Sequence, residues 1–197
     1  MANLNSFEMR FLQGFISAPA MTASLTPSSR SLARAVVQDI DLGDADVVLE
    51  YGPGTGVLTD FILPELKPGA KFAAIELNPH FVQMFKTRYP SAQVFEDSVG
   101  NVEEICRSAG MQSVDCIISG LPWALFSESE QMQFLEATIA VLKPGGQFAT
   151  FTYLHSHALL PGAKRFANLL PKYFRSVTRS RVVWLNFPPA FVYRCRR

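Results

Sequence analysis

The sequence lacks the features that would place the chain across a membrane, outside the cell or around a metal ion. No stretch approaches the roughly 20 apolar residues that a helix needs to cross a bilayer. The N-terminus has no basic segment followed by an apolar core, so no secretory signal is predicted. The three cysteines are odd in number and show no paired metal-ligand spacing. We therefore expect a cytoplasmic protein with reduced thiols and no bound metal.

Histidine is scarce too, and acids are missing from the last third of the chain. With three histidines and no serine on a nucleophile turn, the sequence offers no hydrolytic triad. All 17 acids lie at or before Glu136, whereas residues 137–197 carry 10 of the 18 bases. A cationic end suits an anionic partner, either nucleic acid or a lipid surface. A solvated face without a partner would give the same pattern.

What is present is a chain of 197 residues with 48% hydrophobic content, which fits one globular domain with a substantial core. Its organising stretch is residues 47–56, where an apolar run ends in an acid and a tyrosine. Three alternating glycines follow: Gly52, Gly54 and Gly56. The run predicts a buried strand and the glycines a tight turn. Apolar spacing near 3.6 over residues 55–66 predicts a helix after the turn.

A second apolar run ends in Glu76, twenty residues after Gly56. A strand, a glycine turn and a helix N-terminus form a nucleotide-sized pocket at the carboxyl edge of a sheet. An acid at this distance accepts hydrogen bonds from both ribose hydroxyls. The glycine spacing is G-x-G-x-G, not the G-x-G-x-x-G of dinucleotide-binding proteins. The arrangement from Glu50 to Gly56, then Glu76, resembles motifs I and II of class I S-adenosylmethionine-dependent methyltransferases. A Rossmann-like domain whose glycine turn serves packing alone is the alternative.

The rest of the chain alternates strand and helix patterns and contains no internal repeat. Strands are expected at 71–76, 92–95, 113–119, 147–154, 174–185 and 190–195, and helices at 78–88, 99–109, 129–142 and 165–170. His155 and His157 are expected in a loop. The class I resemblance implies an α/β, Rossmann-like fold: a mostly parallel seven-stranded sheet with helices on both faces and a C-terminal antiparallel hairpin. We expect N-terminal helices over 1–45 and the cofactor-binding core over 46–197.

The N-terminus is rich in phenylalanine. Residues 4–16 place four large apolar side chains on one helical face: Leu4, Phe7, Phe11 and Phe15. A helix of this kind can lie in a membrane interface, cover the active site as a lid or dock on the core. Membrane contact and plain docking fit the pattern equally.

Methyl transfer from a sulfonium needs alignment and exclusion of water rather than a covalent catalyst. Residues 120–123, Gly-Leu-Pro-Trp, resemble the N-L-P-Y segment of the adenine-N6 methyltransferases that act on ribosomal RNA. In that family an Asn side chain and the Pro carbonyl hold the amino nitrogen, whereas this chain has Ser119 and Gly120 there.

A resemblance to the bacterial phospholipid N-methyltransferases covers nearly the whole chain. Its segments are residues 27–33, 50–59, 119–122, 151–153 and 186–194. These enzymes are peripherally membrane-bound and methylate phosphatidylethanolamine towards phosphatidylcholine. The resemblance implies the same activity, an anionic phospholipid membrane as partner, and a cytoplasmic, peripherally membrane-associated location. The alternatives are methylation of an RNA adenine and a non-catalytic module that binds through its basic end.

The resemblance also implies a cofactor site for S-adenosylmethionine, with S-adenosylhomocysteine as product. Glu50 fixes the ammonium end of the cofactor, Glu76 binds the ribose, and Asp97 with its neighbour reads the adenine. The expected cofactor-binding residues are Glu50, Tyr51, Gly52, Gly54, Thr55, Gly56, Glu76, Leu77, Asp97, Ser98, Ser119 and Leu121. Core packing is the alternative role for Tyr51, and capping of the next helix is an alternative for Asp97.

The expected catalytic residues are Tyr153, His155 and Trp123. The first two would orient the acceptor amine, although a loop histidine is also compatible with no role. Expected substrate-binding residues are Ser29, Arg30 and Tyr193. Arg30 would hold the lipid phosphate, or be a solvated helix residue. The rings of Trp123, Tyr153 and Tyr193 would face the cationic headgroup, with about 0.5–2 kcal/mol for each cation–π contact.

Overall fold

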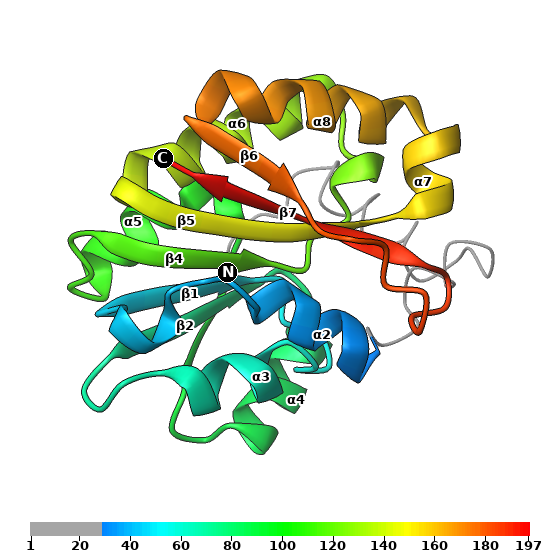
Figure 1. Ribbon diagram of the computed structural model, residues 1–197. Coiled ribbons are helices and arrows are strands. Elements are labelled where there is room, and N and C mark those ends of the chain that lie inside the picture. The colour runs from blue at the N-terminus through cyan, green and yellow to red at the C-terminus, as the bar shows by residue number, and fades with distance from the viewer. Residues whose placement is uncertain (1–28) are drawn as a thin grey trace.

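The computed structural model describes residues 29–197, which form a central sheet between two layers of helices (Figure 1). The strands are β1 Val47–Tyr51, β2 Lys71–Glu76, β3 Gln93–Glu96, β4 Val114–Ser119, β5 Leu142–Tyr153, β6 Ser176–Arg179 and β7 Ala190–Arg196. The α-helices are α2 Arg30–Val37, α3 Thr59–Ile62, α4 Pro79–Arg88, α5 Val102–Ser108, α6 Glu128–Val141, α7 Leu154–Leu159 and α8 Pro161–Tyr173. The 3-10 helices are η2 Leu42–Asp44, η3 Leu63–Glu65, η4 Val99–Asn101 and η5 Trp123–Leu125.

The seven strands lie in the order β3-β2-β1-β4-β5-β7-β6. Strands β1 to β5 are parallel, and β7 runs antiparallel to both β5 and β6. The predicted mostly parallel sheet with an antiparallel C-terminal pair is therefore confirmed. Because β1 pairs with β2 on one side and β4 on the other, the strand order reverses there, and ligands of such sheets bind outside the carboxyl ends of these strands.

Helices cover both faces of the sheet, as predicted. Successive side chains of a strand point to opposite faces, so Leu49 joins a core cluster with α5, α6 and α8. Its neighbour Val48 joins a second cluster with α2 and α3. Figure 1 shows α6 and α8 over one face and α2 and α3 over the other.

The helix predicted over 55–66 is shorter than expected. The chain turns through residue 58, and α3 then spans one turn before η3 begins with Pro64 near its start. Gly56 has a φ of +84°, outside the right-handed helical region, so the helix cannot extend towards the N-terminus through this residue. The glycines therefore set the N-terminal limit of this helix.

Three other boundaries differ from the prediction. Strand β5 begins at Leu142, which pairs with Val114 of β4, and the Gly145 N–H donates to the Arg197 carbonyl at 3.0 Å. His155 and His157 lie in α7 rather than in a loop. The strand expected over 174–185 ends at Arg179, which leaves a long connection to β7.

Within residues 29–197 no helix is long and apolar enough to cross a membrane. The Phe-rich helix predicted over 4–16 lies outside the described residues, so its role as lid, membrane contact or docked helix stays a prediction. The division into residues 1–45 and 46–197 also stays a prediction. Helix α2 is integral to the core, with Leu32, Ala33 and Val36 fully buried.

Candidate active site

The glycine turn after β1 is tied to the sheet and open at its centre. Gly52, Gly54 and Gly56 have φ values of +65°, +53° and +84°, which L-residues with a side chain rarely adopt. The Gly52 N–H donates to the Ile75 carbonyl of β2 at 2.8 Å. A Cβ placed on Gly54 would meet no described atom within 4 Å. The turn thus leaves room for a ligand against its backbone.

Glu76 ends β2 and lies against this turn. One carboxylate oxygen accepts the Gly54 N–H at 3.1 Å, and the other accepts the Asn78 N–H at 2.9 Å. Burial raises the pKa of Glu76, and the backbone N–H groups partly oppose that effect. The structure thus places Glu76, the residue expected to bind the ribose, beside Gly54.

Glu50 lies beneath the turn and is fully buried. Its Oε2 accepts the Thr59 hydroxyl at 2.7 Å, whereas Oε1 has no hydrogen-bond partner among the described residues. Burial, with a smaller contribution from Glu76 and Asp60, raises the pKa of Glu50 to about 8. A buried polar atom without a partner costs roughly 1–3 kcal/mol, so this carboxylate is suited to a cationic ligand group.

The end of β3 brings a third acid to the same edge, because the Asp97 N–H donates to the Glu76 carbonyl at 3.2 Å. The Asp97 carboxylate accepts the Ser98 N–H at 2.6 Å and the Asn101 amide at 2.8 Å. The Ser98 hydroxyl, not Asp97, caps η4 by accepting the Gly100 N–H. The capping role considered for Asp97 is therefore wrong.

The segment after β4 contacts the glycine turn. Ser119 is fully buried, and its hydroxyl accepts the Trp123 indole N–H at 3.0 Å and the Leu121 N–H at 3.3 Å. A Cβ on Gly120 would lie 2.8 Å from the Gly52 carbonyl oxygen. The Leu121 side chain lies over Gly52 as well. Two turns from distant parts of the sequence therefore pack backbone to backbone.

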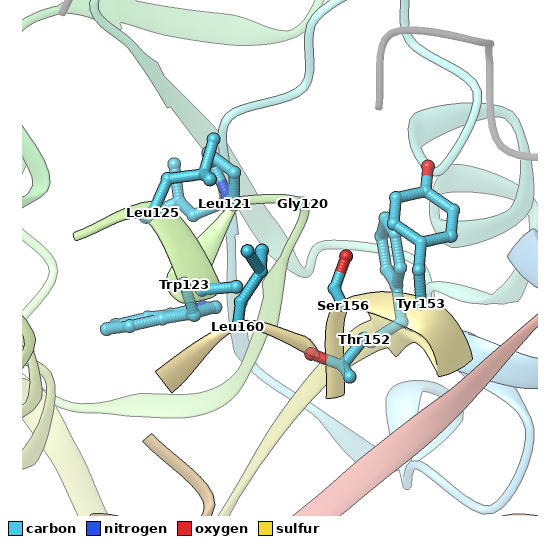
Figure 2. A pocket seen from close by; sticks show the side chains of 11 residues that line it. Gly120, Leu121, Trp123, Leu125, Thr152, Tyr153, Ser156 and Leu160 are labelled. Atoms are coloured by element: carbon cyan, nitrogen blue, oxygen red, sulfur yellow. The ribbon is translucent and has the colours of Figure 1, made fainter. Parts of the chain in front are cut away.

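A pocket opens beside this contact, at the carboxyl ends of β4 and β5 (Figure 2). Its lining residues are Gly120, Leu121, Pro122, Trp123, Ala124, Leu125, Phe151, Thr152, Tyr153, Ser156 and Leu160. None carries a charge, and Tyr153 is the one titratable side chain among them. Figure 2 shows Tyr153 on one side of the pocket and Leu121, Leu125 and Trp123 on the other. Burial raises the pKa of Tyr153, so its hydroxyl stays protonated near neutral pH.

Two predicted catalytic residues come together. Tyr153 ends β5, His155 lies exposed in the first turn of α7, and their rings stack with centroids 5.7 Å apart. Trp123 is 1% exposed, and its ring stacks on Phe166 at 4.5 Å. Trp123 also lines the pocket, although most of its ring is packed in the core, so its contact with the substrate stays a prediction.

Two aromatic predictions fail for the same reason, since both side chains belong to the core. Tyr193 is 3% exposed on β7, packs against Phe166 and is not a pocket-lining residue. Tyr51 is fully buried in the cluster shared with α5 and α6, so core packing is its role. Thr55 and Leu77 are half-buried at the glycine turn and at the end of β2.

The two most specific segments of the sequence resemblance meet in space. The Ser29 N–H, at the N-cap of α2, donates to the side-chain oxygen of Asn186 at 2.8 Å across 157 residues. Arg30 is exposed, with its guanidinium 5.4 Å from the centre of the Phe61 ring. Sequence reasoning assigned no role to Asn186, although its segment was singled out.

Tyr89 is a further residue that sequence reasoning missed. Its hydroxyl donates to the Gly56 carbonyl at 2.8 Å and contacts the Asp60 carboxylate at 2.7 Å. A Cβ on Gly56 would collide with this ring at 2.6 Å. No sequence pattern near Tyr89 predicts this role, because its partners Gly56 and Asp60 lie about thirty residues earlier, before β2 and α4.

The methyltransferase domain family matches residues 48–146, from the second residue of β1 to the start of β5. The ornithine lipid N-methyltransferase of Singulisphaera acidiphila is 30% identical over 192 residues, 94% of either chain. A probable ribosomal RNA small subunit methyltransferase A of Methanosarcina barkeri is 38% identical over 96 residues, 47% of this chain and 30% of that protein. The O-methyltransferase of Bacillus cereus in complex with S-adenosylhomocysteine (SAH) matches all of this chain and 93% of that chain with a TM-score of 0.67 at 13% identity.

The fold is that of the class I methyltransferases. The chain belongs to the methyltransferase domain family, and it is an S-adenosylmethionine-dependent methyltransferase. Its residues fit this cofactor, because within residues 29–197 Glu50 Oε1 has no hydrogen-bond partner and nothing fills the space against Gly54. The cofactor brings an ammonium group and a nucleoside, which match the orphaned carboxylate and the acids at the strand ends.

Glu76→Ala should raise the dissociation constant of S-adenosylmethionine about tenfold. The variant loses the carboxylate expected on the ribose and the acceptor for the Gly54 N–H, and each such hydrogen bond contributes about 1 kcal/mol. Isothermal calorimetry measures the effect, with the exposed Glu65→Ala as the matched control. An unchanged dissociation constant would remove Glu76 from the cofactor site.

Proposed function

We propose that the chain transfers methyl groups to the amino headgroup of a membrane lipid, with phosphatidylethanolamine as acceptor and phosphatidylcholine as the final product. The uncharged pocket carries this proposal. Because a low-dielectric site disfavours an ammonium ion, it lowers the amine pKa from about 10 and favours the neutral nucleophile. The ornithine lipid relative, which covers 94% of this chain, supports a lipid amine as acceptor.

The cofactor would lie along the strand ends. Glu50 would hold its ammonium group, Glu76 its ribose, and Asp97 with Ser98 its adenine, while the backbone at Gly54 approaches the methionine portion. When bound, S-adenosylmethionine supplies a methyl group on a positively charged sulfur. The chain's own contribution is to align the acceptor nitrogen with that methyl group and to exclude water.

Tyr153 would orient the acceptor. Its protonated hydroxyl oxygen would accept a hydrogen bond from one amine N–H, which points the nitrogen lone pair into the site. His155 stacks on the Tyr153 ring and is exposed, so it would take the amine proton to solvent. Arg30 would bind the lipid phosphate from the N-terminus of α2, next to Ser29.

Methylation of an RNA adenine is the alternative, supported by the ribosomal RNA relatives, but Gly120 opposes it. In the ribosomal RNA enzymes that the segment resembles, an Asn side chain holds the adenine amino group. A side chain on Gly120 would begin 2.8 Å from the Gly52 carbonyl, so this backbone has no room for that amide. The pocket also lacks the cationic side chains that a nucleic acid backbone requires.

The test is methyl incorporation from radiolabelled S-adenosylmethionine into phosphatidylethanolamine, ornithine lipid and RNA, each offered separately, with lipids in detergent micelles. Label in phosphatidylethanolamine is the expected result. Label in ornithine lipid alone would correct the acceptor while keeping the lipid class. Label in RNA alone would overturn the proposal.

Tyr153→Phe should lower kcat on micellar phosphatidylethanolamine by roughly 100-fold, the scale of a misoriented reacting group. Its cofactor dissociation constant should stay unchanged, because Tyr153 lines the pocket at the end of β5 and is not part of the glycine turn after β1. Tyr173→Phe is the matched control, since that hydroxyl contacts Glu136 in a different part of the molecule. A Tyr153→Phe variant with full kcat would exclude the hydroxyl from the reaction.

A further inference from the structure

The connection between β6 and β7 exposes three large apolar side chains, which we call the apolar tip: Trp184, Leu185 and Phe187. Their exposed fractions are 70%, 84% and 86%. The other exposed large apolar residues in the described part of the chain are Leu159, at 76%, and three residues at 37–39%. Three of the four most exposed of these side chains therefore lie within the four positions 184–187.

The tip is held in this shape from inside. Asn186, in the middle of it, is 3% exposed. Its side-chain oxygen accepts the Ser29 N–H at 2.8 Å, and its side-chain nitrogen donates to the Pro188 carbonyl at 2.6 Å. The polar residue points inward and its apolar neighbours point outward, which inverts the usual pattern for a solvent-facing loop. Such an arrangement suits a surface that contacts an apolar partner.

Three arginines are linked to the tip through the chain or through its contacts. Arg181 is exposed three residues before Trp184, and Arg30 follows Ser29, to which the tip is bonded. Arg179 lies 3.9 Å from the centre of the Phe191 ring at the start of β7. Among the described residues, none of these three arginines forms an ion pair. The partner that complements this surface is therefore apolar inside and anionic outside.

The tip is also joined to the pocket. Ala190 pairs with Tyr153 at the end of β5, and the Leu154 N–H donates to the Pro189 carbonyl at 2.8 Å. Figure 1 shows this connection projecting beyond the sheet on the same side as α7. A partner bound at the tip would thus lie next to the strand end that carries Tyr153.

We propose that the apolar tip inserts into the interface of an anionic lipid bilayer, while Arg30, Arg179 and Arg181 contact the headgroup phosphates. Tryptophan favours the membrane interface, and basic residues beside apolar ones strengthen binding to anionic lipid. The tip would present a headgroup amine to the pocket, which is the part of this inference that rests on the proposed function. The three tip residues themselves do not line the pocket.

The chain provides its own probe, because its two tryptophans are Trp123, 1% exposed, and Trp184, 70% exposed. With the full chain and vesicles of phosphatidylglycerol and phosphatidylethanolamine, we expect Trp184 emission to shift to shorter wavelength and brominated lipid to quench it. Pure phosphatidylcholine vesicles should give a weaker response. Trp184→Phe should lose the shift yet still sediment with vesicles.

Replacing all three tip residues with serine should lower the vesicle partition coefficient at least about tenfold. The double variant Met84→Ser and Met132→Ser removes exposed apolar side chains elsewhere and should bind as the wild type does. Circular dichroism confirms that each variant is folded.

Several outcomes would overturn this surface. One is an unchanged Trp184 spectrum on addition of vesicles, and another is undiminished sedimentation of the serine variant. A third is poor quenching of Trp184 by acrylamide in the absence of lipid, which would mean that the chain itself covers the tip. If the wild type is a dimer and the serine variant is a monomer that still binds vesicles, the tip is a contact between two copies of the chain.

Methylation of micellar lipid separates the two proposals. Activity on micelles, with Trp184 remaining in water when vesicles are added, refutes membrane insertion of the tip alone. Vesicle binding without lipid methylation refutes the proposed function alone.

Discussion

Gly120→Asn should abolish measurable cofactor binding and lower the free energy of unfolding by about 1–3 kcal/mol, the usual cost of overpacking. The new Cβ would lie 2.8 Å from the Gly52 carbonyl oxygen and 3.5 Å from that of Tyr51. Both neighbours are backbone atoms, and the Gly120 N–H donates to the Tyr51 carbonyl at 2.8 Å. Relief of the clash therefore requires the glycine turn to move away from β4, which deforms the surface on which the cofactor rests.

Calorimetry with S-adenosylmethionine and urea unfolding measure the two effects. Gly43→Ala is the control, because a Cβ there meets its nearest atom at an ordinary 3.7 Å and the backbone φ is not positive. Wild-type cofactor affinity in Gly120→Asn would show that the two turns are not in contact as described. Appearance of RNA methylation in this variant would count against a lipid acceptor.

Glu50→Gln should weaken SAH binding at least about tenfold at pH near 8.5 and remove a pH dependence that the wild type shows. Burial raises the pKa of Glu50 to about 8, so below this pH the free protein holds the carboxyl protonated. A ligand ammonium favours the ionised form, and binding must then release that proton. Wild-type affinity should therefore rise from about pH 6 to about pH 8 and level off above it.

Stability should move in the opposite direction. The folded pKa of Glu50 lies above its ordinary value of 4.5, so the folded state binds the proton more tightly than the unfolded state does. This residue therefore makes stability fall as the pH rises from about 4.5 to about 8, and Glu50→Gln should melt at a higher temperature than the wild type at pH 8. Equal pH profiles for binding and for melting in the two proteins would show that Glu50 neither faces the ligand nor carries a raised pKa.

Local sequence patterns determined the parts of the fold that depend on neighbours in the chain. The strand ending at Tyr51, the strand Lys71–Glu76, the glycine turn and the helix opened by Asn78 all lie where the patterns predicted them. An apolar run, a cap and a glycine act within a few residues. The parallel order of these strands then brings their carboxyl ends together, and Glu76 at the end of one lies beside Gly54 after the other.

Only the tertiary structure decided which aromatic and polar side chains reach the site. Tyr193 looked like a substrate contact in the sequence, yet it is buried on β7 and packs against Phe166 of α8. Asn186 gained its role from Ser29, 157 residues away. The apolar run that predicted a strand through Leu185 ended instead as an exposed tip, because after Arg179 the chain keeps only an isolated bridge to β7, between Val183 and Ala190, before it turns. Burial is set by contacts between segments distant in the chain, and a local periodicity does not encode those contacts.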